Sequence, residues 1–274
     1  MLGLLLLQVM ASCLWLGHSE VVNSFDSCPQ FFYSGTFPND ALNPNNPARI
    51  CQRFRNSYHY ATLYDRDRRI PVYSAYKYQP VEEKRPRGWW FVEPQLTGKC
   101  NLNDMETESY VMKKCKISPD DIKESQAVDD DYRGLKVLVR GHLCPTGHMH
   151  NDVSKMATFS LTNMVPQNST LNDGQWRVYE DKTMKKNTED CTTTYVITGA
   201  VPGNTYVSDN RVNRPSHIWS AACCLRGDKP KDAWGAIAEN DKNEVEELSL
   251  GELEERLTEL YGGTVTLFNN VCPR

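Results

Sequence analysis

Three histidines fall within nine residues near the middle of the chain, and several asparagines follow them closely. These residues are His142, His148 and His150, followed by Asn163, Asn168 and Asn172. An imidazole accepts or donates a proton near neutral pH, and imidazole nitrogens and amide oxygens both bind metal ions. The stretch is therefore a candidate site for moving a proton beside a bound cation.

The chemistry that suits this combination is metal-assisted hydrolysis of a phosphodiester. His142 would act as the general base that deprotonates an attacking water. Asn172 would hold the cation through its amide oxygen, a hard and neutral ligand that suits Mg²⁺. The cation would neutralise the pentacovalent phosphate and stabilise the leaving oxygen.

Two strands and a helix must bring these side chains together. The expected elements are a strand at 134–139, a second strand at 158–165, a loop at 166–171 and a helix from 172 to about 186. The first strand delivers Arg140, Gly141 and His142 at its end, and the helix opens with Asn172. The pattern predicts a β-β-α unit with the imidazole facing the start of the helix.

The rest of the chain favours further strands and one more helix. Strands are expected at 61–64, 70–78, 193–199, 217–222 and 234–238. Ser249 and Glu252 have the spacing of a capping box, which begins a helix that runs through Tyr261 and ends at Gly262. Residues 97–132 are polar and favour neither element. Since no repeat or linker divides the chain, we expect a single α+β domain over residues 20–274.

The first 19 residues are typical of a secretory signal peptide. An apolar stretch from Leu2 to Leu16 is followed by small residues, and it is too short for a membrane span of roughly 20 residues. Nine cysteines follow it, which in an oxidising compartment predicts disulfides with one cysteine left over. We therefore expect a secreted protein without a membrane span, which is stabilised by disulfides whose pairing the sequence does not give.

Charge composition does not decide the substrate class. The net charge is -4, so the whole molecule does not attract polyanions, although residues 66–69 and 84–87 form local basic clusters. Such clusters are more often solvated than phosphate-binding. Composition therefore neither supports nor excludes a nucleic-acid substrate.

Three motifs in a fixed order carry a resemblance to a known family. Arg140-Gly141-His142, then TFSLTNMVPQ at 158–167 and LNDGQW at 171–176, resemble the DNA/RNA non-specific endonucleases. The resemblance implies a ββα-metal nuclease core with a mixed or antiparallel sheet and flanking helices. It implies cleavage of both DNA and RNA with Mg²⁺ or another divalent cation such as Mn²⁺. With the signal peptide and CPQFF at 28–32, the chain is similar to secreted members of the family.

The resemblance also implies roles for individual residues. His142 matches the general base, Asn172 the single protein ligand of the metal, and Asn163 an amide near the base and the substrate. Glu180 matches a carboxylate that acts on the water shell of the metal. Eight helical residues rise about 12 Å, so Glu180 is expected to act through water rather than as a direct ligand beside Asn172.

Two arginines are expected to contact the phosphate, and one position departs from the family pattern. Arg87 matches the arginine that clamps the phosphate, and Arg140 is a lower-ranked candidate for the same contact. The family motif begins with an aspartate, whereas this chain has Val139. That change removes a charge from the site and bears on both rate and metal affinity.

Other interpretations of the same residues remain open. His142, Cys144, His148 and His150 could be zinc ligands, although their tight spacing and the demand for Cys144 in a disulfide disfavour this. His148 and His150 are more simply solvated loop residues. Asn172 could be only a helix N-cap, a role compatible with metal binding, and Trp176 is expected in the core.

Two functions are compatible with the residues and the resemblance. The favoured hypothesis is a secreted endonuclease acting on DNA and RNA. The alternative is a catalytically weakened or inactive nuclease fold that serves as an extracellular binding module, supported by Val139 and by a glycosylation sequon at Asn168. Related nucleases are often homodimers, but the sequence carries no interface signal.

Overall fold

The computed structural model describes residues 20–81, 86 and 88–274. The expected signal peptide at 1–19 and the candidate phosphate ligand Arg87 lie outside the described residues. Glu20, the first of the described residues, is fully buried, so the described part begins inside the folded domain.

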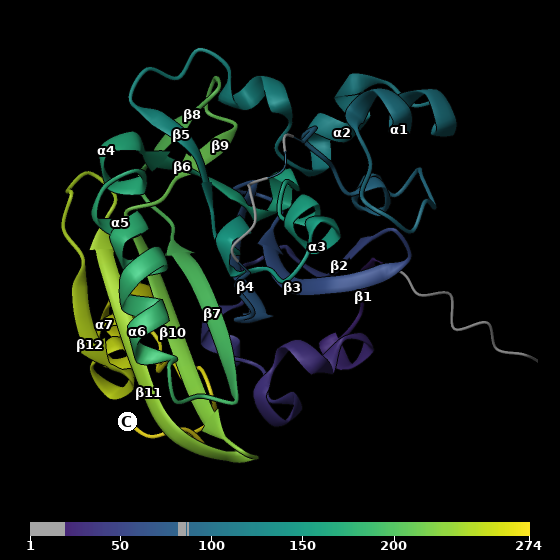
Figure 1. Ribbon diagram of the computed structural model, residues 1–274. Coiled ribbons are helices and arrows are strands. Elements are labelled where there is room, and N and C mark those ends of the chain that lie inside the picture. The colour runs from purple at the N-terminus through teal and green to yellow at the C-terminus, as the bar shows by residue number, and fades with distance from the viewer. Residues whose placement is uncertain (1–19, 82–85, 87) are drawn as a thin grey trace, which may run out of the picture.

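An eight-stranded antiparallel sheet forms the centre of the fold, in the order β1-β2-β3-β4-β7-β10-β11-β12 (Figure 1). The strands are β1 Val21–Val22, β2 Pro47–Phe54, β3 Ser57–Asp65, β4 Ile70–Lys77, β7 Thr193–Val201, β10 His217–Arg226, β11 Lys229–Glu239 and β12 Glu246–Ser249. All five strands predicted outside the β-β-α unit lie in this sheet. A two-stranded ribbon, β8 Thr205–Val207 and β9 Val212–Arg214, lies apart from it.

Seven short α-helices accompany the strands in the described part of the chain. They are α1 Glu108–Cys115, α2 Pro119–Ser125, α3 Asp152–Ala157, α4 Ser169–Asn172, α5 Gln175–Val178, α6 Met184–Asn187 and α7 Leu250–Tyr261. Helices α1 and α2 lie in the polar segment for which the sequence favoured neither element. The predicted capping box of α7 is confirmed, since Ser249 accepts from the Glu252 N–H and Glu252 accepts from the Ser249 N–H. The helix ends at Gly262, whose φ of 75° suits glycine.

Single turns of 3₁₀ or π helix connect these elements. The 3₁₀ turns are Phe25–Ser27, Pro29–Phe31, Tyr33–Gly35, Asp40–Leu42, Pro94–Thr97, Asp129–Tyr132, Thr146–His148 and Leu161–Asn163. A π turn at Tyr179–Thr183 joins α5 to α6. Because α5, the π turn and α6 follow one another directly, they run as one rod over residues 175–187.

The sheet has an apolar layer on each face because its central strands bury alternate residues on opposite sides. On β7, Ile197 and Val201 pack in the core that holds α7, whereas Val196 packs in the core beneath the 175–187 rod. Helix α7 contributes Leu253 to the first core, and the rod contributes Met184 to the second. Figure 1 shows α7 and the rod on opposite faces of the sheet.

The predicted β-β-α unit is present, with different boundaries. Strand β5, Leu138–His142, pairs antiparallel with β6, Met164–Asn168, and α4 follows directly. The second strand was predicted at 158–165 and a loop at 166–171, and both ranges are wrong. Pro166 is tolerated in β6 because a two-stranded sheet has only edge strands.

Asn168, rather than Asn172, begins the helical part of this unit. The Asn168 side chain accepts from the Thr170 N–H at 2.9 Å, which caps α4, and Asn172 is the last residue of that helix. The interpretation of Asn172 as a helix N-cap is therefore wrong. Asn172 is partly exposed, whereas Leu171 beside it is buried.

Four disulfides and one free cysteine account for the cysteines of the described residues. The pairs are Cys28–Cys51, Cys100–Cys115, Cys191–Cys224 and Cys223–Cys272. Cys144 is the free one, so the expectation that it would be needed for a disulfide is wrong. Burial raises the pKa of its thiol well above the usual value, which keeps it protonated and unreactive.

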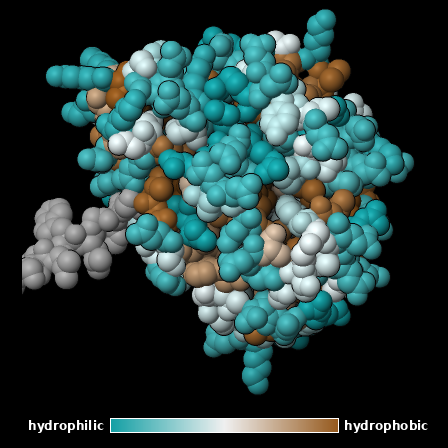
Figure 2. Space-filling model, turned by 180° about the vertical axis from the view of Figure 1, so that it is seen from behind, coloured by the Kyte–Doolittle hydropathy of each residue, from teal (hydrophilic) through white to brown (hydrophobic). Residues whose placement is uncertain are grey.

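The surface opposite the view of Figure 1 is largely hydrophilic. Figure 2 shows its hydrophobic side chains in small patches separated by polar groups. Small scattered apolar groups are usual on protein surfaces.

Removal of the Cys223–Cys272 disulfide should destabilise the fold more than removal of Cys100–Cys115. The two bridges close 49 and 15 residues of sequence, and the chain-entropy estimate gives losses of about 4 and about 3 kcal/mol. Thermal unfolding of the two Cys→Ser double variants measures this. An unchanged melting temperature on loss of Cys223–Cys272 would contradict the assigned pairing.

Candidate active site

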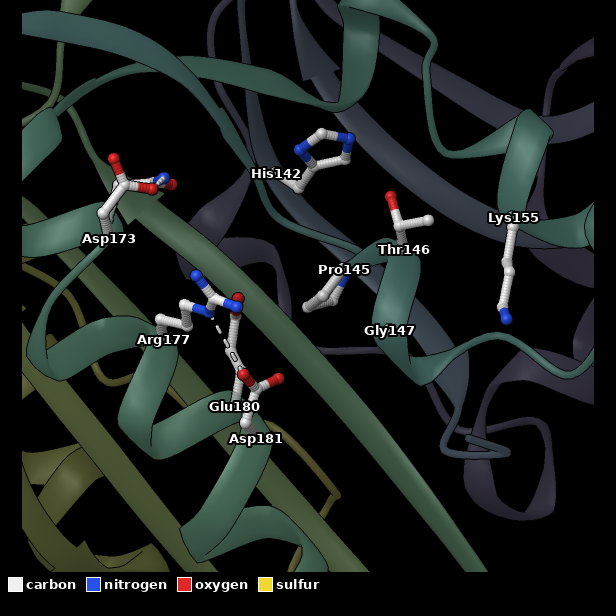
Figure 3. Close-up of a pocket in the computed structure, with 10 residues that line it drawn as sticks. His142, Pro145, Thr146, Gly147, Lys155, Asp173, Arg177, Glu180 and Asp181 are labelled. Carbon is white, nitrogen blue, oxygen red and sulfur yellow. Dashed lines mark hydrogen bonds and ion pairs between the residues drawn. The ribbon is translucent and has the colours of Figure 1, made fainter. Parts of the chain in front are cut away.

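A pocket of about 400 Å³ opens where β5 faces the 175–187 rod. It is lined by His142, Pro145, Thr146, Gly147, Lys155, Asn172, Asp173, Arg177, Glu180 and Asp181. Figure 3 shows His142 on one side and Arg177, Glu180 and Asp181 on the helical segment across the space. Three of the predicted site residues, His142, Asn172 and Glu180, are thus brought together in one pocket.

The His142 ring is held by aromatic neighbours at the end of β5. Phe159 contacts it edge-on with ring centroids 5.6 Å apart, and Trp90 lies at 6.1 Å. Gly141 precedes it because the Gln167 side chain crosses the backbone there. A Cβ on Gly141 would lie 2.1 Å from the Gln167 Oε1, so only glycine fits this strand position.

Asn163 lies beneath the loop that follows His142 and is fully buried, with 0% of its surface exposed. Its Oδ1 accepts from the Cys144 N–H and the Ser74 hydroxyl, both at 2.9 Å. Its Nδ2 donates to the carbonyls of Cys144 and Thr158, both at 3.0 Å. Asn163 therefore lies near His142, and its amide is fully engaged inside the protein, while its nearness to the substrate stays a prediction.

Oxygen-bearing side chains line the other wall of the pocket. The Asn172 Nδ2 donates to the Asp173 Oδ1 at 3.1 Å, a bond that does not use the Asn172 amide oxygen. Glu180 and Asp181 add two more carboxylates to the lining. An amide oxygen suits a hard divalent cation such as Mg²⁺, which keeps most of its waters, so the residues present fit a cation held by Asn172 with the carboxylates beyond its water shell.

Positive charges lie between and beside these carboxylates. The Arg177 Nε pairs with the Asp181 Oδ2 at 3.3 Å, one helical turn along the rod. The buried Lys155 of α3 lines the pocket on the side of Thr146. The mixed lining can therefore accept a cation and a phosphate group at once.

His148 is buried rather than solvated, which corrects the sequence interpretation. Only 4% of its surface is exposed, and Tyr78 packs edge-on against its ring with centroids 4.7 Å apart. Burial lowers its pKa to about 4 and outweighs the hydrogen bond to the Glu180 carbonyl and the Asp181 carboxylate, which both raise the pKa. His148 is consequently neutral at physiological pH, while His150 is exposed as expected.

The zinc alternative is wrong. Cys144 and His148 are both buried, whereas His150 is exposed. Among the described residues, no three or more histidine, cysteine, aspartate or glutamate side chains are grouped to hold a metal ion.

Three further sequence candidates lie outside the pocket lining. The Arg140 guanidinium donates to the Asp129 Oδ1 at 2.5 Å and stacks over Trp90 and Tyr132, outside the pocket lining, so its expected phosphate contact stays a prediction. Asn168 is partly exposed and caps α4. Trp176 is buried in the core, as predicted.

Sequence reasoning missed several residues of the lining. Lys155, Asp173, Arg177 and Asp181 were not singled out. Asp173 carried a signal, since it follows Asn172 directly, and Arg177 and Asp181 have the four-residue spacing of a helical ion pair. Lys155 carried no such signal because its place depends on how α3 packs.

Val139, where the family has aspartate, lies across from Gln167 in the β5–β6 register. The Gln167 side chain is fully buried, and neither polar atom of its amide has a hydrogen-bond partner among the described residues. A buried amide without a partner is costly. Val139 cannot bond to this amide, so a polar group near His142 has no hydrogen-bond partner among the described residues.

The neutral His148 should make stability depend on pH. Its pKa is about 4 in the folded protein and about 6.5 when unfolded, so protonation favours the unfolded chain as pH falls. This histidine should cost about 2 kcal/mol of stability between about pH 7.5 and pH 5. Urea unfolding of wild type and His148→Gln at both pH values isolates the effect, and identical pH dependence would contradict it.

Comparison with known proteins gives the family. The model described as DNA/RNA non-specific endonuclease matches residues 37–270. Endonuclease domain-containing 1 protein of Mus musculus is 32% identical over 241 residues, which cover 85% of this chain and 46% of that protein. The Homo sapiens protein of the same name is 32% identical over 256 residues, covering 90% and 48%. This chain spans about half the length of these relatives.

A mitochondrial nuclease and a solved structure are also similar. Mitochondrial nuclease EXOG of Mus musculus is 41% identical over 71 residues, covering 25% of this chain and 19% of that protein. A chain from the crystal structure of the EndoG/EndoGI complex aligns with a TM-score of 0.55 at 19% identity, covering 79% of this chain and 86% of that one. The chain therefore has the ββα-metal nuclease fold and belongs to the DNA/RNA non-specific endonuclease family.

Proposed function

We propose that residues 20–274 act as one secreted domain that cuts DNA and RNA internally with the help of Mg²⁺. The observation that carries the proposal is that His142, Asn172 and Glu180 line one pocket although they come from a strand, a short helix and the π turn. Family membership supports a phosphodiester substrate.

In this mechanism His142 takes the proton from the attacking water. Its ring is kept in place by Phe159 and Trp90, so little motion is needed when the proton moves. Asn172 would hold Mg²⁺ through its amide oxygen, and Glu180 and Asp181 would bind the water around it. The cation, when bound, supplies charge stabilisation for the phosphate.

Substrate binding is proposed to depend on the phosphate backbone. Lys155 and Arg177 lie in the pocket lining, and Arg87, outside the described residues, is proposed as a further phosphate contact. Contacts to phosphate and metal carry no base information. Low sequence specificity and action on both DNA and RNA follow from this.

An extracellular setting is proposed from the covalent structure. Four disulfides suit an oxidising compartment, where such bonds persist. None of the helices in the described part of the chain is both long and apolar enough to cross a bilayer. The proposed signal peptide at 1–19 would direct the protein there.

Removal of the base or of the metal ligand should abolish most plasmid nicking. His142→Ala should lower the rate about 100-fold to 10,000-fold, the usual contribution of a general base. Asn172→Ala should cost about 100-fold and raise the Mg²⁺ concentration required. The assay follows relaxation of supercoiled plasmid with Mg²⁺ and with EDTA.

The exposed His150 provides the matched control for the plasmid assay. His150→Ala should nick as fast as wild type. Equal nicking by wild type and His142→Ala would identify a contaminant, and the absence of nicking in both with every divalent cation would contradict the nuclease proposal.

The second candidate function is a nuclease fold that binds extracellular ligands without cutting them. Val139 and the unsatisfied Gln167 amide favour it, because the family aspartate is missing where the strand pair approaches the base. A glycan on Asn168, at the other end of the short α4 from Asn172, would also crowd entry of a duplex. Intact mass before and after deglycosylation measures its occupancy.

Restoring the acidic residue separates the two functions. Val139→Asp should raise nicking and metal affinity by about 10-fold, because it adds a carboxylate that can accept from the Gln167 amide. Val137→Asp, at a side chain 62% exposed two residues away, is the matched control and should change neither. Equal effects of the two variants would contradict a role for position 139.

A further inference from the structure

The π turn changes which residues of the 175–187 rod share a face. In an α-helix the Met184 N–H would bond to the Glu180 carbonyl, but here it bonds to the Tyr179 carbonyl, five residues back. The extra residue rotates the succeeding turn by about 100° relative to a continuous α-helix. Tyr179 and Met184 are consequently both buried, while Glu180 and Asp181 line the pocket.

His148 contacts this turn from the opposite element. Its Nε2 lies 3.1 Å from the Glu180 carbonyl oxygen. Because a carbonyl can only accept a hydrogen bond, Nε2 carries the proton and donates it. The Nδ1 of the neutral ring then accepts from the Tyr76 hydroxyl at 3.0 Å.

Tyr76 connects the imidazole to the main sheet. It lies on β4, and its hydroxyl is 3.3 Å from the Thr198 hydroxyl on β7. Tyr76 and His148 are both almost fully buried, so water competes little for these bonds. A continuous hydrogen-bonded path thus runs from the centre of the sheet to the backbone of Glu180.

We propose that His148 is a positioning residue that holds the π turn so that the Glu180 and Asp181 carboxylates face Asn172 and a divalent cation between them. The inference rests on the proposed function for the identity of the cation. His148 touches neither substrate nor cation and acts only through the backbone of Glu180. Thr146 and Gly147, which precede His148 in the chain, line the same pocket, so the position of His148 also fixes the pocket wall that they form.

Two amide substitutions test this because each replaces one ring nitrogen. His148→Gln places its amide N–H where Nε2 lies and keeps the donor to Glu180, whereas His148→Asn reaches only the position of Nδ1. Isothermal titration with Mn²⁺, without substrate, should show about 10-fold weaker binding for His148→Asn and a value within about twofold of wild type for His148→Gln. The kcat for plasmid nicking should likewise be lowered in His148→Asn and stay close to wild type in His148→Gln.

A double-variant cycle separates positioning from general loss of structure. If His148 acts through Glu180, then His148→Asn should weaken Mn²⁺ binding little further in the Glu180→Ala background. Tyr261→Phe is the control, since it removes another side-chain hydrogen bond to a carbonyl, the partly buried bond of the α7 residue Tyr261 to Ala200 at 2.9 Å. It should lower the melting temperature and leave Mn²⁺ binding unchanged.

The outcomes distinguish this inference from the proposed function. Three results would each overturn the inference. Wild type and His148→Asn could bind Mn²⁺ equally well, or wild type could bind no Mn²⁺. In the third, His148→Asn would weaken Mn²⁺ binding in the Glu180→Ala background as much as it does in wild type. If the predicted affinities are found but wild type never cuts nucleic acid, the positioning role stands and the nuclease proposal fails.

Discussion

The buried amide of Asn163 is the interaction on which the candidate active site most depends. Immediately after His142 the chain leaves β5, and the N–H groups of Leu143 and Cys144 bond to the carbonyl and the Oδ1 of Asn163. The Ser74 hydroxyl on β4 bonds to the same Oδ1. A buried polar group is stable only when its hydrogen bonds are satisfied. The Asn163 amide therefore fixes the path of the chain segment that follows His142. It thereby ties the proposed base to the rigid sheet.

The opposite wall of the pocket is fixed by different means. There the oxygen-bearing side chains stand on short helical segments, α4 and the π turn, which have few internal hydrogen bonds of their own. Leu171 and Tyr179 pack into the core and keep these segments in place, and the His148 imidazole donates a hydrogen bond to the backbone carbonyl of Glu180. The two walls are joined through the β5–β6 pair that leads into α4 and through the bond between His148 and the Glu180 carbonyl, so the spacing of the proposed base and metal ligand depends on both connections.

Local sequence patterns predicted which strands and helices are present better than they predicted the residues at which these elements begin and end. Alternation in 193–199 and 217–222 and the capping box at Ser249 indicated strands and a helix that the structure contains. The motifs around His142 and Asn172 placed both residues in one pocket. The start of the helix was wrong because Asn168 and Asn172 are equally good caps locally, and burial of Leu171 decides between them.

What the sequence could not show depends on contacts between distant residues. His148 looked like a solvated loop residue, since nothing nearby in the chain reveals that Tyr76 and Glu180 bond to its two nitrogens. Anomalous diffraction from Mn²⁺-soaked crystals tests the convergence of the two walls most directly. We expect a peak about 2 Å from the Asn172 amide oxygen, in the pocket that holds His142. A peak elsewhere, with Asn172 turned away from it, would contradict the proposed site.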